Sequence, residues 1–187
     1  MAQLLPTEDV DDIDEIALAG ARRGDSRAFE RLYKAYVGRV YGLCLRMTAN
    51  RAMAEDCTQE TFINAWKGLK DFESRSALGT WLHRIAVNSV LGRARRGELE
   101  MKQDLEETAD VPDALVAPND ELAVEDLEKL LGKLPGGARS VVVLYGVYGY
   151  SHEETAHMLG IAVGTCKAQL HRARHLLKDQ MVAEGWT

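Results

Sequence analysis

Basic and hydrogen-bonding side chains recur at helical spacing near the end of this 187-residue chain. They follow one another at steps of four, three and four, with Arg172 alongside: Lys167, His171, Arg174 and Lys178. Residues three or four apart share one face of an α-helix, and an α-helix fits the major groove of DNA. This face could therefore bind phosphates and base edges, although many basic helical faces are simply solvated.

The residues that must position this face predict a helix-turn-helix. Ser151 lies three positions before Glu154, the spacing of a reciprocal capping box at a helix start. Gly160 falls where a helix over 151–159 must end in a left-handed conformation. Gly164 and Thr165 then open a second helix. Its inward stripe is expected to hold the two helices together, and consists of Cys166, Leu170, Ala173 and Leu177.

Metal and thiol chemistry are also conceivable on this second helix. His171 and His175 are four residues apart, but no third ligand is spaced to join them, so we expect no metal and no cofactor. Cys166 lies near a helix start beside Lys167, surroundings that can lower a thiol pKa. All three cysteines nevertheless fit apolar helical positions, so we interpret Cys44, Cys57 and Cys166 as reduced core residues.

The net charge of −6 is unevenly distributed along the chain. Residues 1–25 carry 2 basic and 7 acidic side chains, whereas residues 26–96 carry 13 and 6. Residues 97–128 carry 1 basic and 12 acidic side chains, and residues 129–187 carry 7 and 4. Two basic blocks are thus separated by an acidic one, so the overall negative charge does not exclude nucleic-acid binding.

The acidic stretch divides the chain into two small helical domains. Residues 97–120 contain Pro112 and Pro118, no aromatic residue and little apolar periodicity, which indicates a flexible linker. We therefore expect an all-α protein. Its parts are an acidic tail with the start of the first helix (1–25), a first domain (26–96), the linker (97–120) and a second domain (121–183) that ends in the helix-turn-helix.

Apolar periodicity places the helices within these domains. In the first domain it predicts helices over 29–47, 52–69 and 78–96, and in the second over 122–134 and 138–148. The inner stripe of the 52–69 helix is expected to be Ala54, Thr58, Phe62, Ala65, Trp66 and Leu69. No stretch is long and apolar enough for a membrane span, and the acidic N-terminus is unlike a secretory signal. We therefore expect a soluble, cytoplasmic protein.

Two further helical faces carry polar groups. The outer face of the 52–69 helix presents an acidic and amide patch of Asp56, Gln59, Glu60 and Asn64. Spacing alone does not decide whether this patch binds a partner or is merely solvated. The 78–96 helix aligns Trp81, Arg84, Asn88 and Arg95 and ends in further arginines. Cations, an amide and an aromatic ring suit a single nucleic-acid strand, although Trp81 could equally be a core residue.

Four ordered motifs resemble those of one protein family. They read AFERLY at 28–33, AEDCTQETFINAW at 54–66, TWLHRIAVN at 80–88 and GTCKAQLHRAR at 164–174. The chain resembles the two-domain, extracytoplasmic-function (ECF) class of bacterial RNA polymerase sigma factors of the sigma-70 family. The resemblance covers nearly everything except the N-terminal tail and the linker.

The resemblance implies a promoter-recognition subunit that binds core RNA polymerase and has no catalytic site or small-molecule substrate. It assigns the patch of Asp56, Gln59, Glu60 and Asn64 to polymerase binding. It assigns the −10 element to Phe72, Ser74, Arg75, Ser76, Trp81, Arg84, Asn88, Arg95 and Arg96. It assigns the −35 element to Thr165, Lys167, Ala168, His171, Arg172 and Arg174. Many relatives have Val-Arg-Ser-Arg where this chain has Cys166 to Gln169, so the −35 sequence cannot be named from these residues.

Regulation and two alternatives complete these expectations. Family members are commonly held inactive by an anti-sigma factor, often at the membrane, and act in stress or envelope responses, so an anti-sigma partner is expected here. A free-standing repressor or activator is the second reading, but it leaves the first domain unexplained. An enzyme is the third, and neither an acid/base set nor a glycine-rich phosphate loop supports it.

Overall fold

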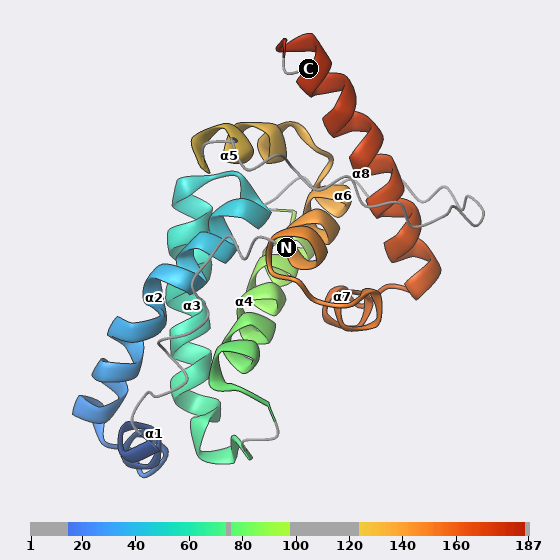
Figure 1. Cartoon of the computed structure of the whole chain (residues 1–187). Coiled ribbons are helices and arrows are strands. Elements are labelled where there is room, and N and C mark those ends of the chain that lie inside the picture. The colour runs from blue at the N-terminus through green and yellow to red at the C-terminus, as the bar shows by residue number, and fades with distance from the viewer. Residues whose placement is uncertain (1–14, 74–75, 98–123, 186–187) are drawn as a thin grey trace. The chain divides into compact units, whose positions relative to one another are not determined.

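The computed structural model describes residues 15–73, 76–97 and 124–185. Within these ranges every regular element is helical and no strand occurs, as the sequence predicted. The described residues form two compact units, the first built on α1, α3 and most of α2 and α4, and the second on α5 to α8 with the last residues of α2 and α4 (Figure 1). Residues 98–120 of the predicted linker lie outside the described ranges.

The first unit contains four α-helices and one short turn of 3-10 helix. In chain order they are α1 (Glu15–Arg22), α2 (Ser26–Thr48), α3 (Arg51–Gly68), η1 (Leu69–Asp71) and α4 (Leu78–Arg95). Figure 1 shows α2, α3 and α4 running along the length of this unit, with α1 at one end of α2. The three helices predicted from periodicity are confirmed. Asn50 caps α3, because its side chain accepts the backbone N–H of Met53 at 3.0 Å.

A separate short helix, α1, precedes the first long helix, and apolar periodicity did not reveal the break between them. The chain turns after Arg22, and the Asp25 carboxylate accepts the backbone N–H of Arg27 at 2.9 Å, which caps the start of α2. A Cβ atom built on Gly20 would lie 2.9 Å from that of Ala28. The two helices therefore approach so closely that only glycine fits at this crossing.

The second unit is built from four α-helices and one π-helical segment. They are α5 (Val124–Lys133), α6 (Gly136–Val141), η2 (Val142–Val147), α7 (His152–Leu159) and α8 (Val163–Ala183). The sequence predicted one uniform helix over 138–148, but its second half is the π-helix η2. The first three residues of η2 are buried: Val142, Val143 and Leu144. A 3.6-residue period could not reveal this change, because a short apolar run looks the same in both kinds of helix.

Arg139 joins α5 to α6. Its guanidinium donates hydrogen bonds to the carbonyl oxygens of Leu131 at 2.9 Å, Gly132 at 2.9 Å and Leu134 at 2.8 Å. The carbonyls of Leu131 and Gly132 lie in the last turn of α5 and that of Leu134 directly follows it, where helical carbonyls lose their usual intrahelical partners. Burial lowers the pKa of Arg139 from its ordinary value. The side chain thus closes the end of one helix while it belongs to the next.

Glycine at the end of α7 should contribute measurably to stability. Gly160 has a φ of +68°, which side chains disfavour, whereas Gly164 in α8 has ordinary helical geometry and open space around a built Cβ. Gly160→Ala should lower the free energy of unfolding by about 1–2 kcal/mol. The matched control Gly164→Ala should leave it unchanged or raise it by up to about 1 kcal/mol. Urea denaturation measures both, and equal effects would contradict this account.

Candidate nucleic-acid and partner interfaces

The turn between α7 and α8 has the predicted geometry. Ser151 Oγ accepts the backbone N–H of Glu154 at 3.1 Å, and the Glu154 carboxylate accepts the backbone N–H of Ser151 at 2.9 Å. This reciprocal capping box fixes the start of α7. At the other end Gly160 is left-handed, as expected. The two helices are therefore held at a defined turn by local sequence chemistry.

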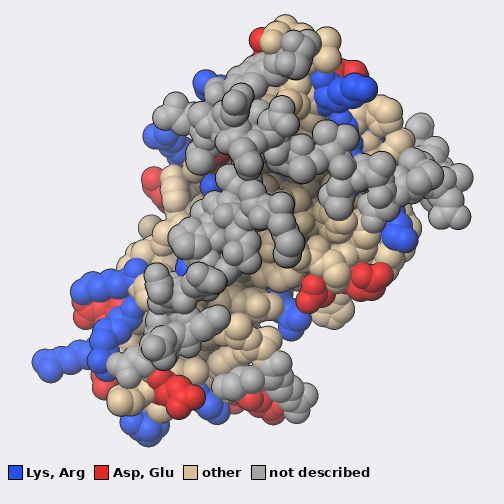
Figure 2. Space-filling model, viewed as in Figure 1, with Lys and Arg blue, Asp and Glu red and all other residues tan. Residues whose placement is uncertain are grey.

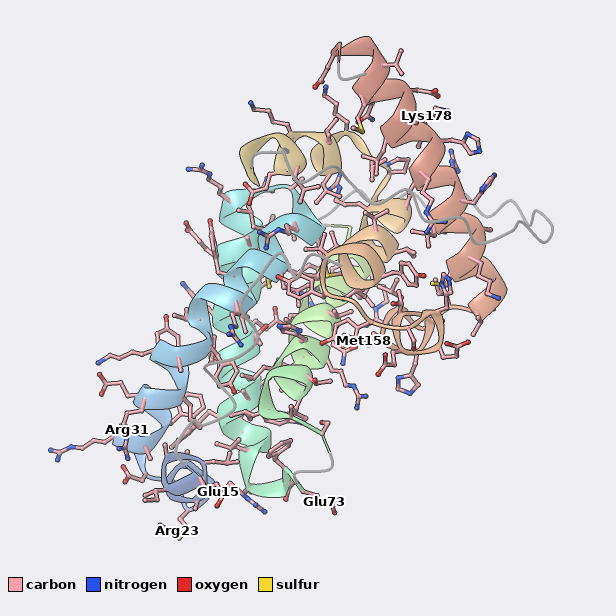
Figure 3. The ribbon with its side chains drawn as sticks, in the orientation of Figure 1. Glu15, Arg23, Arg31, Glu73, Met158 and Lys178 are labelled. Carbon is pink, nitrogen blue, oxygen red and sulfur yellow. The ribbon has the colours of Figure 1, made fainter. Side chains whose placement is uncertain are left out.

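The inward stripe of α8 decides which side chains face solvent. Cys166, Leu170 and Ala173 are buried, and Leu177 is half-buried. On the remaining surface Lys167 and Arg172 are exposed. The other four residues assigned to the −35 element are half-buried, namely Thr165, Ala168, His171 and Arg174. Lys178 lies farther along the same helix (Figure 3). We call Lys167, Ala168, His171 and Arg172 the α8 outer face.

Cys166 is packed in the core rather than activated. It is fully buried, and burial, followed by the nearby Glu153 carboxylate, raises its pKa to about 11. Its Sγ lies 3.8 Å from Nδ1 of His152, whose ring stacks on Tyr145 with centroids 4.3 Å apart. The interpretation of Cys44, Cys57 and Cys166 as core residues is confirmed, and the alternative of a lowered thiol pKa at Cys166 is wrong, because burial raises that pKa.

One side of α4 presents the polar groups that the sequence aligned there. Arg84, Asn88 and Arg95 are exposed, as is Arg96 just beyond the helix. Trp81 is half-buried, and its ring packs on Phe72 with centroids 5.0 Å apart. We call Trp81, Arg84, Asn88 and Arg95 the α4 outer face. It combines cations and an amide with an aromatic ring that is partly open to solvent.

Phe72, which the resemblance assigns to the −10 element, is a buried residue of the first unit. Phe72 is only 5% exposed and belongs to a core cluster with Leu32 and Leu69. Its ring packs on Trp81 and beside Leu69, which directly follows α3. Ser76 of the same loop is half-buried. Ser74 and Arg75 lie outside the described residues.

The outer face of α3 contains an apolar residue that the sequence reasoning missed. Asp56, Gln59 and Asn64 are exposed and Glu60 is half-buried, but Ile63 lies among them with 54% of its surface exposed. Ile63 is four residues after Gln59 and seven after Asp56, so its helical position could have identified it. We call Asp56, Gln59, Glu60, Ile63 and Asn64 the α3 outer face.

Partly exposed aromatic rings lie along the contact between α2 and α3. Trp66 was expected in the inner stripe, but it is 39% exposed and packs on Phe29 with centroids 4.8 Å apart. Tyr33 is 40% exposed and meets Phe62 edge-on, with centroids 4.7 Å apart. Trp66 and Tyr33 thus lie at the boundary between core and solvent, where each packs on a ring of the other helix.

Neither a metal-binding cluster of three or more side chains nor a membrane-spanning helix occurs in the described part of the chain. Among residues 15–73, 76–97 and 124–185, no three His, Cys, Asp or Glu side chains gather where they could hold a metal ion. In the same ranges none of the helices combines the length and apolarity that crossing a membrane requires.

Comparison with known proteins identifies two family segments. Residues 32–99 match Sigma-70 region 2, and residues 125–177 match Sigma-70, region 4. The first segment holds the α3 and α4 outer faces, and the second holds α7 and α8. Together these matches span more than half of the chain.

Individual relatives agree with the family segments. ECF RNA polymerase sigma factor SigM of Mycobacterium tuberculosis H37Rv is 34% identical, over 86% of this chain and 81% of its own. ECF RNA polymerase sigma factor SigW of Bacillus subtilis is also 34% identical, over 86% and 92%. The solved structure of the sigma factor RpoE from Bartonella quintana, in complex with the anti-sigma factor NepR, matches at 28% identity with a TM-score of 0.59 and covers 81% of this chain and 94% of that one. This chain belongs to the ECF class of the sigma-70 family of RNA polymerase sigma factors.

Proposed function

We propose that this chain binds core RNA polymerase through α3 and directs it to promoters through α4 and α8. One observation carries the proposal: a single chain exposes a polar helical face with an apolar centre on α3 and, on α4 and α8, two helical faces that carry cations. As a member of its family the protein is a transcription initiation factor.

The composition of the α3 outer face is more typical of a protein-binding surface than of a solvated one. Ile63 gives it an apolar centre, and Asp56, Gln59 and Asn64 give it a hydrogen-bonding rim. Protein interfaces are typically built in this way, with a buried apolar core inside a polar border. The partly exposed ring of Trp66 extends the apolar part by one helical step. We assign this surface to core polymerase.

The other two faces suit different forms of DNA. On the α4 outer face, Arg84 and Arg95 can meet phosphates while Asn88 and the open side of Trp81 meet unstacked bases, which fits an opened −10 strand. On the α8 outer face, Lys167, His171 and Arg172 lie along one helix that follows a tight turn. This arrangement fits the major groove of a duplex −35 element.

Regulation by an anti-sigma factor is part of the proposal, and the solved complex of the Bartonella relative supports it. An inhibitor that covered the α3 outer face would block polymerase binding, and we place this event in the cytoplasm, where the polymerase acts. Affinity purification with the intact chain as bait tests the idea. Recovery of polymerase with no second stoichiometric partner, under conditions where the target genes are silent, would count against it.

Ile63 should contribute strongly to polymerase affinity. Ile63→Ala removes the apolar centre of the α3 outer face, so we expect affinity for core polymerase to fall by about tenfold or more, as for interface hot spots. Run-off transcription should fall in parallel. Fold stability should change little, because the side chain is 54% exposed.

The matched control for this test is Val182→Ala. Val182 is 58% exposed, but it lies near the end of α8, which belongs to the other compact unit. It should leave both affinity and transcription unchanged. Equal binding by wild type, Ile63→Ala and an Asp56→Ala plus Gln59→Ala variant would remove polymerase from this surface.

The two DNA faces should respond to different promoter elements. Mutating a promoter element lowers run-off transcription by wild-type protein. With Asn88→Ala, mutation of the −10 element should lower transcription less than it does with wild type, whereas mutation of the −35 element should lower it as much as before. With Lys167→Ala, mutation of the −35 element should lower transcription less, and mutation of the −10 element should have its full effect. A DNA change has a smaller effect once the side chain that contacts it has been removed. Lys70→Ala, an exposed lysine of η1 outside these faces, is the control for lost charge. Identical loss at both elements for Asn88→Ala and Lys167→Ala would contradict the assignments.

A further inference from the structure

Two histidines on the exposed side of α8 lie closer together than helical spacing alone requires. The Nε2 atoms of His171 and His175 are 3.2 Å apart, and the ring centroids are 4.5 Å apart with an interplanar angle of 79°. His175 is exposed and His171 is half-buried, so solvent reaches the pair. The rings thus turn the same nitrogen toward each other across one helical turn.

The distance between the two Nε2 atoms matches the distance between two nitrogen atoms that bind the same metal ion. An imidazole nitrogen binds zinc at about 2.0–2.1 Å, so two such nitrogens lie about 2.9 Å apart at a right angle and about 3.3 Å apart at the tetrahedral angle. The observed 3.2 Å falls between these values. We propose that His171 and His175 form a two-nitrogen binding site for one divalent nickel, copper or zinc ion.

The proton balance of the pair allows this binding. In the neutral pair one Nε2 carries the hydrogen that bridges to the other, so only one Nε2 has a lone pair to offer. When the metal binds, that hydrogen is lost to solvent and Nδ1 of the same ring takes up another, which leaves both Nε2 lone pairs for the ion. No net proton is released from the neutral pair, whereas protonated rings must first lose theirs.

The surroundings set the class and strength of the site. Among the described residues no third His, Cys, Asp or Glu completes a cluster, so water must fill the remaining coordination positions. Imidazole ligands favour copper, nickel and zinc over magnesium or calcium. Arg172, Arg174 and Lys178 repel a cation, whereas Asp179 lies one turn beyond His175 and attracts it. A site of moderate affinity, strongest for copper, follows.

Occupation of the pair should also affect DNA recognition, a consequence that rests on the proposed function. The Nε2 atom of His171 cannot bind a metal ion and a base edge at the same time. Metal and −35 DNA should therefore weaken each other's binding by the same factor, as linkage requires. The metal site itself needs no DNA, so the two ideas can be tested separately.

Titration calorimetry of the tag-free, full-length protein with NiCl2 at pH 7.5 tests the site. We expect one nickel ion per chain, with affinity weakened more than about tenfold by either His171→Gln or His175→Gln, because even outer-shell changes at metal sites have effects of that order. His157→Gln is the matched control, since His157 is exposed on α7 of the same unit, and it should bind as wild type does.

A spectroscopic measurement tests the same site independently of calorimetry. The Cu2+ adduct should show electron paramagnetic resonance couplings to two nitrogens in the wild type and to one in each single variant, with circular dichroism confirming that the variants fold. Unchanged nickel affinity in the His171→Gln plus His175→Gln variant would overturn the proposal. If the metal site holds but nickel leaves −35 DNA affinity unchanged, the metal site stands and the assigned DNA contact of His171 fails.

Discussion

The helices α3, α4 and α8 each bury one face, and this constraint decides where the candidate binding surfaces lie. The units are small, so a helix that packs on the core has its opposite side in water. The buried positions hold many small side chains, such as Ala54, Ala65 and Ala173, which let helices pack closely. Because the inward stripe is fixed by burial, the outward residues of α3, α4 and α8 are fixed as well, with no further interaction needed to orient them.

Local chemistry explains why the helix-turn-helix was the most predictable part. Ser151, Glu154 and Gly160 act within a few residues of their own position, so sequence spacing is enough to place them. The same reasoning failed where tertiary contacts decide. The helix α1 owes its place to a glycine contact with α2, and η2 departs from the 3.6-residue period inside an apolar run that gives no sign of it.

The aromatic residues show how the candidate sites were only partly predictable. The sequence placed Trp66 inside and Phe72 at the DNA surface, but Trp66 is 39% exposed and Phe72 only 5%. Phe72 follows η1 and turns back over Leu69, so a residue in a loop is buried, and Trp66 lies at the edge of its stripe, where α2 covers only part of a large ring. Periodicity gives the direction of a side chain on its own helix, but not the extent to which a neighbouring helix covers it.

The charge distribution implies that promoter selection belongs to the assembled polymerase. The α8 outer face offers Lys167 and Arg172, and the α4 outer face offers Arg84 and Arg95, so each neutralises only a few phosphates. Binding energy that depends on phosphate neutralisation scales with that small number, and the 12 acidic side chains of residues 97–128 oppose it. Two weak sites bind strongly only when they are held at the spacing of their targets, because the second contact then forms at high effective concentration. On the proposed assignment, the α3 outer face supplies much of the affinity, because its centre, Ile63, is an exposed apolar side chain whose burial in an interface does not depend on phosphate neutralisation.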